Sequence, residues 1–358
     1  MSKKRLQKAK IIAVSSGKGG VGKSNIATNL GISFADAGQN VCLFDADINL
    51  ANINILLGLV PVYTLQHLFS DNKSLNDIII SGPSGLDIVA GASGVSEFTS
   101  LNKKQQQRLV KALSEIENKY DYLIVDTAAG IDDTLLSFLH AVPYLIITLT
   151  REPTSLTDAF SLLKVLKKQG YNRTVLIIIN MVSGRKMAKQ IFTRFSEAVS
   201  KYLQLNVRLA GYIVSDDAVS LAVQAQQALL KFAPKSSAAM CLESIAMRLL
   251  KVLDKNGQAE ILLSNYFISL QEELYEPETW EQLLTEVDAL DEVEGRRLYE
   301  SLKKKFNHCA QPVVKSEQKQ RPQLCSADSV KIILNSDTDF QYGLRQALTL
   351  AARLDREL

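Results

Sequence analysis

Eight residues near the start of the chain have the types and the spacing that bind phosphate. Residues 17–24 read Gly-Lys-Gly-Gly-Val-Gly-Lys-Ser and fit the pattern G-x-x-x-x-G-K-[ST] at each fixed position. The glycines allow backbone N–H groups to approach phosphate oxygens without a clash from Cβ. Lys23 is predicted to reach the β- and γ-phosphates, and Ser24 is predicted to ligate Mg²⁺. A glycine-rich turn without a ligand is the alternative.

The residues on both sides of this loop favour the phosphate-binding interpretation. The apolar run at residues 11–14 predicts a buried strand. Residues 25–37 place Ile26, Leu30 and Phe34 at helical spacing. Because the loop ends where a helix begins, the partial positive charge of the helix N-terminus also favours a bound anion.

Carboxylates follow two further apolar runs. Asp45 comes directly after residues 41–44 and Asp47 two positions later, and Asp126 comes directly after residues 122–125. Strand ends of this kind face the ligand crevice of an α/β sheet. Asp126 therefore resembles a Walker-B aspartate that holds Mg²⁺ through a water, although a helix cap is the alternative role.

Strand and helix patterns alternate as far as residue 255, and this alternation predicts an α/β fold with a doubly wound, mainly parallel sheet. The pattern then changes to charged helical segments. The predicted divisions are a basic tail at 1–9, a nucleotide-binding domain at 10–255, a mostly helical extension at 256–308, a linker at 309–328 and an amphipathic segment at 329–358.

The composition is that of an ordinary globular protein that stays in the cytoplasm. Of the 358 residues, 46% are hydrophobic and 22% are charged, and the net charge of +3 is too small to indicate a nucleic-acid partner. No apolar run approaches the roughly 18 residues that a membrane span requires. The four cysteines form no C-x-x-C pair, which argues against a zinc site or an iron–sulfur carrier.

The loop, with its extra Lys18, resembles the deviant Walker-A motif of the MinD/ParA family of P-loop ATPases. Residues 10 to about 250 are covered by this resemblance, and the segments 45–58, 126–131 and 152–159 are most similar to the flagellar-number regulators of the family, called FlhG or FleN. ATP and Mg²⁺ are the implied cofactors. The resemblance also implies an ATP-dependent homodimer in which Lys18 reaches the nucleotide of the partner subunit.

Further roles follow only from the resemblance. Asp47 is the implied residue that orients the attacking water, Asn180 is implied to contact adenine, and Glu152 is implied to contact the partner's nucleotide. Asp45 is implied to assist Mg²⁺ or to support the site from behind. The predicted nucleotide residues are Gly17, Lys18, Gly19, Gly20, Val21, Gly22, Lys23, Ser24, Asn25, Glu152 and Asn180, and the predicted metal residues are Ser24, Asp45 and Asp126.

The function that this resemblance implies is a slow, Mg²⁺-dependent switch ATPase that controls the number or placement of flagella. A flagellar GTPase, a basal-body component or a transcription regulator is the expected protein partner, although the N-terminal D-Q-A-x-x-L-R element of that subgroup is absent from residues 1–10. The alternatives are a partition or division-site ATPase, which would bind DNA non-specifically, a metabolic ligase, and a scaffold that does not hydrolyse ATP. For residues 340–358, docking on the protein's own core or on a partner is favoured over peripheral contact with the inner face of the cell membrane.

Overall fold

The computed structural model describes residues 8–46, 52–64, 67–68, 73–90, 101–255 and 262–274. All of them belong to the first of two units into which the chain divides, Met1–Leu274. The predicted linker at 309–328 and the amphipathic segment at 329–358 lie outside the described residues, as does most of the predicted extension at 256–308. The predicted domain boundary at residue 255 therefore stays a prediction.

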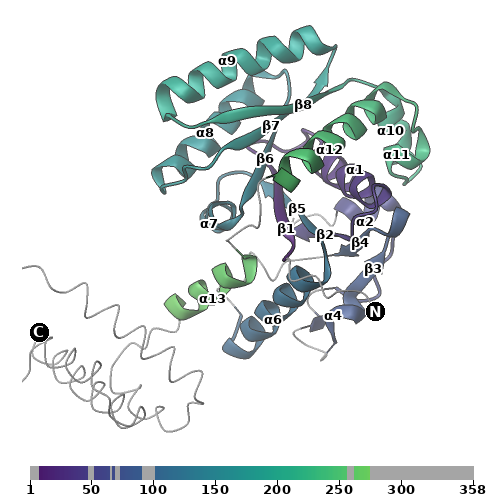
Figure 1. Ribbon diagram of the computed structural model, residues 1–358, viewed down its shortest axis with the longest axis vertical. Helices are drawn as coiled ribbons and strands as arrows, with labels where there is room; N and C mark the ends of the chain where they lie inside the picture. Colours follow the sequence, from purple (N-terminus) through teal and green to yellow (C-terminus); the bar gives the residue numbers. More distant parts are fainter. Residues whose placement is uncertain are drawn as a thin grey trace, which may run out of the picture. The chain divides into compact units, whose positions relative to one another are not determined.

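The described unit is built on one sheet of eight strands (Figure 1). The strands are β1 Lys10–Ser16, β2 Val41–Ala46, β3 Ile79–Ser81, β4 Asp87–Val89, β5 Tyr122–Ala129, β6 Tyr144–Leu149, β7 Val175–Val182 and β8 Val207–Val214. Their order across the sheet is β3-β4-β2-β5-β1-β6-β7-β8. Each neighbouring pair is parallel except β3 and β4, which are antiparallel. The structure thus confirms the predicted mainly parallel α/β fold.

Helices cover both faces of the sheet, which explains why its central strands are continuous apolar runs. One face is covered by α1 Lys23–Asp36, α10 Asp217–Gln224, α11 Leu229–Phe232 and α12 Ser237–Lys255. The other is covered by α6 Lys103–Lys119, α7 Asp133–Ala141, α8 Pro153–Lys168, α9 Arg185–Leu203 and α13 Leu263–Leu274. The short elements α2 Asn52–Leu57, α4 Leu75–Ile78 and η1 Pro83–Gly85 complete the described part.

The pleat of β1 divides the core into two layers. Ile11 and Ala13 belong to the hydrophobic cluster beneath α6 to α9, whereas Ile12 and Val14 belong to the cluster beneath α1 and α12. All seven residues of β1 are buried. The strand that leads into the predicted phosphate loop therefore lies at the centre of the sheet, where it is held from both sides.

The helix α13 falls inside the predicted extension and packs on the described unit. Its Ser264 donates from both N and Oγ to the buried Glu117 of α6, over 2.9 and 2.6 Å, and its Phe267 is buried in the core. Figure 1 shows α13 beside α6. Among the described residues, none of the helices combines the length and the apolar character that crossing a membrane would need.

Candidate nucleotide-binding site

The glycine loop that connects β1 to α1 contains two glycines in the left-handed backbone conformation. Gly20 has a φ of 77° and Gly22 a φ of 90°, conformations that side-chain-bearing residues rarely adopt. Gly22 occupies the N-cap position of α1, and the helix begins at Lys23. Space around Gly19 and Gly20 is open, because a Cβ on either would meet no atom within 4 Å. The loop therefore offers an open glycine cradle at a helix N-terminus, as the sequence pattern predicts.

The first glycine has a different role, because it packs directly on another helix. A Cβ at Gly17 would overlap the backbone of Asp158 and Ala159 in α8. Since these are backbone atoms, no change of rotamer could relieve the overlap. The start of the loop is thus seated against α8, and only glycine allows this close approach.

Asn180, at the carboxyl end of β7, fastens the loop from the opposite side. Its Nδ2 donates to the carbonyl oxygen of Val21 over 2.9 Å, and its Oδ1 accepts from the N–H of Met181, also over 2.9 Å. Asn180 and Val21 are both buried. The sequence assigned Asn180 to the adenine ring; the structure shows that its amide holds the loop, and the adenine contact stays a prediction.

Two buried carboxylates lie side by side on neighbouring strands. Asp45 of β2 and Asp126 of β5 are register partners, and both are fully buried. Asp126 is also the register partner of Val14 in β1, two residues before that strand ends. Asp45 Oδ2 accepts from the N–H of Ile53 in α2 over 3.5 Å. The predicted metal residues Asp45 and Asp126 are therefore brought together beside the strand that enters the loop.

The loop after Asp126 is tied to the same strand end. Thr127 Oγ1 donates to the carbonyl of Val14 over 3.2 Å, and the N–H of Gly130 donates to the carbonyl of Ser16 over 3.3 Å. Beyond these bonds Ile131 is half exposed. Because these bonds join residues 127–130 to the end of β1, movement of residues 127–130 would displace the residues that lead into the phosphate loop.

Lys18 projects from the loop and finds its partners at the start of α8. Its Nζ lies 2.7 Å from Glu152 Oε2 and donates to Thr154 Oγ1 over 3.0 Å. The hydrogen bond and the charge of Lys18 hold the pKa of the Glu152 carboxyl below its usual value, so this group is ionised at neutral pH. Both side chains remain accessible, at 39% and 58% exposed. The pair therefore forms within one chain at the solvent-facing rim of the site.

The residues present fit a magnesium nucleoside triphosphate. Lys23 is buried at the first position of α1, and Ser24 follows it half buried. Mg²⁺ in proteins commonly takes one or two side-chain oxygens together with phosphate oxygens and waters. The Ser24 hydroxyl and the Asp126 carboxylate have this chemistry, and Asp45 is the register partner of Asp126 on the neighbouring strand. When bound, Mg²⁺ would neutralise charge that develops on the phosphates.

One end of the sheet gathers nearly every residue that the sequence assigned to the site. The loop and Glu152 follow β1 and β6, Asp45 and Asn180 lie one and two residues before the ends of β2 and β7, and Asp126 lies three residues before the end of β5. Asp47 lies outside the described residues, so its role stays a prediction. Sequence reasoning missed Thr154, whose position two residues after Glu152 in the first turn of α8 was the available signal.

A central parallel strand that runs into a glycine loop and a helix, with a strand-end aspartate on the neighbouring strand, defines a P-loop nucleoside triphosphatase. The ParA family model, described as the NUBPL iron-transfer P-loop NTPase, matches residues 7–250. This chain belongs to the MinD/ParA family of P-loop ATPases.

The similar proteins include an antiactivator and a flagellum site-determining protein. The chain is 37% identical over 238 residues to the antiactivator FleN of Pseudomonas aeruginosa, a match covering 66% of this chain and 85% of FleN. It is 32% identical over 253 residues to the flagellum site-determining protein YlxH of Helicobacter pylori, covering 70% and 85% of the two chains.

Solved structures of MinD share the fold. The cell division ATPase MinD of Pyrococcus furiosus matches with a TM-score of 0.55 and 22% identity, over 68% of this chain and 99% of that one. MinD of Pyrococcus horikoshii, solved as a complex with Mg-ADP, matches with a TM-score of 0.54 and 23% identity, over 71% and 100%.

Proposed function

We propose that this protein is a slow, Mg²⁺-dependent ATPase that works as a switch, and that ATP holds two copies face to face. Each Lys18 then contacts the nucleotide bound to the other copy. Hydrolysis releases the loop after Asp126 and separates the copies. The output of the cycle is a change in which protein partner is bound.

The observation that carries this proposal is the position of Lys18. The side chain leaves the phosphate loop at the rim of the site and is held by Glu152 and Thr154 of the same chain. Exposed ion pairs contribute little to stability because water solvates both partners well. A triphosphate on a second copy carries several negative charges and can therefore compete with Glu152 for the ammonium group of Lys18. In the single chain this ammonium group remains accessible from solvent.

The remaining residues divide the chemistry among them. Lys23 and the loop N–H groups bind the β- and γ-phosphates, while Ser24 and Asp126 hold Mg²⁺. Asp47 orients the water whose oxygen bonds to the γ-phosphorus as the bond to the β–γ bridging oxygen breaks, leaving ADP and phosphate. Lys18 of the second copy stabilises the charge on the transferred group, as a cation supplied in trans can raise such rates by about 10³-fold or more.

The proposed cellular role is control of the number or placement of flagella. FleN and YlxH, whose names describe an antiactivator and a flagellum site-determining protein, support it. The family description mentions iron transfer, but this chain has no C-x-x-C pair among its four cysteines. A flagellar GTPase, a basal-body component or a transcription regulator is the proposed partner, and the protein acts in the cytoplasm.

The dimer is tested by measuring mass with light scattering after size exclusion, in Mg-ATP, in Mg-ADP and without nucleotide. The Asp47→Ala variant is used to trap the ATP state, and we expect a dimer only with ATP. Lys18→Ala in this background should still bind ATP but stay monomeric. Lys164→Ala, which changes an exposed lysine on α8, is the matched control and should dimerise normally.

Two results would contradict the proposal: a dimer that forms equally without ATP, or an Asp47→Ala, Lys18→Ala double variant that dimerises normally. The cellular role is tested separately by counting flagella in a deletion strain complemented with wild type or Lys18→Ala. A normal count in the deletion strain would reject flagellar control. Salt-dependent binding to DNA only with ATP would favour partition instead.

A further inference from the structure

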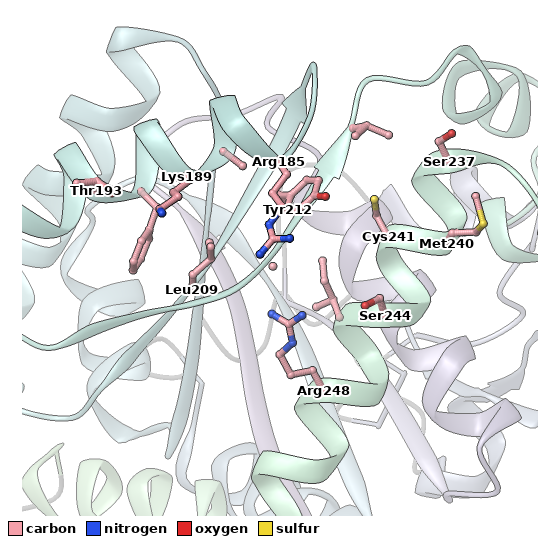
Figure 2. A pocket seen from close by; sticks show the side chains of 15 residues that line it. Arg185, Lys189, Thr193, Leu209, Tyr212, Ser237, Met240, Cys241, Ser244 and Arg248 are labelled. Carbon is pink, nitrogen blue, oxygen red and sulfur yellow. The ribbon is translucent and has the colours of Figure 1, made fainter.

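A groove of about 880 Å³ runs along the β8 edge of the described sheet, between α9 and α12. Its floor belongs to β8, the last strand in the sheet order. None of its lining residues belongs to the candidate nucleotide site. Figure 2 shows the two helices on opposite sides of the strand.

The walls and the floor of this edge groove are largely apolar and firmly packed. Phe192 from α9, Leu209 from β8 and Ile245 from α12 contribute to the lining. The α12 wall sits directly on the strand, because a Cβ at Gly211 would overlap the Ile245 side chain. The groove is therefore a feature of packed elements and does not depend on a loop.

The charged residues of the edge groove all have the same sign. Arg185 and Lys189 come from the first turns of α9, and Arg248 comes from α12. No aspartate or glutamate is among the described residues that line the groove. Within the described part of the chain, none of the three forms an ion pair with a carboxylate. Figure 2 shows the guanidinium groups of Arg185 and Arg248 facing the space between the helices. An occupant with negative charge would satisfy them.

A main-chain carbonyl of β8 accepts a hydrogen bond from a side chain that lines the groove. The register between β7 and β8 shifts at Ala210, which has no register partner in β7. Arg248 Nη1 donates to the Ala210 carbonyl over 3.1 Å. Edge strands present main-chain groups on the side where no second strand pairs with them, and extended peptides commonly bind by pairing with such groups.

We infer that the edge groove binds an acidic, extended peptide segment of a partner protein, lying along β8 with carboxylates near Arg185, Lys189 and Arg248. Apolar side chains between the carboxylates cover the apolar floor. The eight residues of β8 span roughly 26 Å, so the segment is about six to eight residues long. Nucleic acid would satisfy the cations but would leave the apolar floor without a matching surface.

The test is a selection of random decapeptides displayed on phage against the full chain without nucleotide. Counter-selection uses the Arg185→Glu, Lys189→Glu double variant. We expect enriched peptides that combine Asp or Glu with apolar residues. The synthetic form of the most enriched peptide should bind at least about tenfold more weakly to the double variant, since the charge at the site is reversed. N-methylation at alternate backbone positions of the peptide should weaken binding by a similar factor.

The matched control is Lys186→Glu, Lys201→Glu, which makes the same change in net charge on exposed positions of α9 outside the groove lining. This variant should bind the peptide as wild type does. Equal weakening by the control, enrichment of peptides without acidic residues, or indifference to N-methylation would overturn the inference.

Two rival occupants are measured with the same variants. A DNA duplex whose binding is lost in the double variant, with no acidic peptide enriched, would assign the groove to nucleic acid and reject the inference. A nucleotide-independent dimer that dissociates in the double variant would assign it to a second copy and also reject it. Because no nucleotide is present, failure here leaves the ATP-dependent dimer of the proposed function untouched.

Discussion

Replacing Asn180 with alanine should loosen the phosphate loop. The bond from Asn180 Nδ2 to the Val21 carbonyl spans 2.9 Å between residues that are only 8% and 3% exposed. Alanine leaves this carbonyl buried without its donor, which typically costs about 1–3 kcal/mol. The bond from the Met181 N–H is lost as well.

This free-energy cost should weaken nucleotide binding, because the loop must be ordered to bind phosphate. A change of 1.4 kcal/mol corresponds to a factor of ten in affinity, so the dissociation constant should rise by roughly 5- to 150-fold. The tether acts on the loop and not on the base. Binding of inorganic tripolyphosphate, which has no base, should therefore weaken by a similar factor.

The assay is isothermal titration calorimetry of Mg-ATP and Mg-tripolyphosphate with wild type, Asn180→Ala and Asn206→Ala. Asn206 is an exposed asparagine whose Nδ2 bonds to Thr174 Oγ1, so its replacement controls for loss of an amide elsewhere. Both ligands should weaken for Asn180→Ala and neither for Asn206→Ala. If tripolyphosphate bound Asn180→Ala as tightly as wild type, the tether argument would be wrong.

Three further predictions follow from packing and burial. Gly17→Ala should abolish nucleotide binding in a fluorescent-nucleotide titration and lower stability by about 1–3 kcal/mol, because its Cβ meets the backbone of α8. The control, Gly19→Ala, has open space for its Cβ and should keep its stability. An equal fall in melting temperature for the two variants would refute the packing argument. Asp216 accepts from the N–H groups that begin α10 and α12, which lower its pKa. The stabilisation by the Asp216 carboxylate is therefore present above the unfolded pKa of about 3.9 and is lost as pH falls through the lower folded pKa. Asp216→Ala should lower the free energy of unfolding in urea by about 1–2 kcal/mol at pH 7. The difference from wild type should narrow below pH 4, and a difference that is constant with pH would contradict this. Burial raises the pKa of the Cys42 thiol, so Cys42 should react with a thiol reagent at pH 8 far more slowly than the half-buried Cys241, measured with the cysteines beyond residue 300 changed to serine; equal rates would exclude the buried position.

Sequence patterns predicted the parts of the fold that repeat a simple rule. The apolar runs before Asp45 and Asp126 are strands because both faces of the sheet are covered, so burial alone identifies them. The glycine loop was recognisable because its spacing is set by the phosphates it must surround. The first helix was predicted over residues 25–37; α1 begins at Lys23, earlier than expected, because Gly22 in the left-handed conformation opens the helix.

The features that the sequence did not predict depend on long-range contacts. Nothing near Lys18 in sequence indicates Thr154, which is 136 positions away. The tether from Asn180 to Val21 likewise joins residues 159 positions apart. The antiparallel edge strand β3 has only three residues, and α11 has only four, so neither carries a periodic pattern long enough to recognise.

Because Gly17 packs directly on the backbone of α8, movement of the glycine loop would also move that helix. Its 16 residues extend for about 24 Å, with the partners of Lys18 at one end and the exposed Lys168 at the other. Under the proposed function, a shift of the glycine loop on hydrolysis would displace the helix near its first turns, where Gly17 contacts the backbone of Asp158 and Ala159. A rigid rod transmits such a displacement along its length, so a protein that grips the distal end could sense which nucleotide is present without approaching the phosphates.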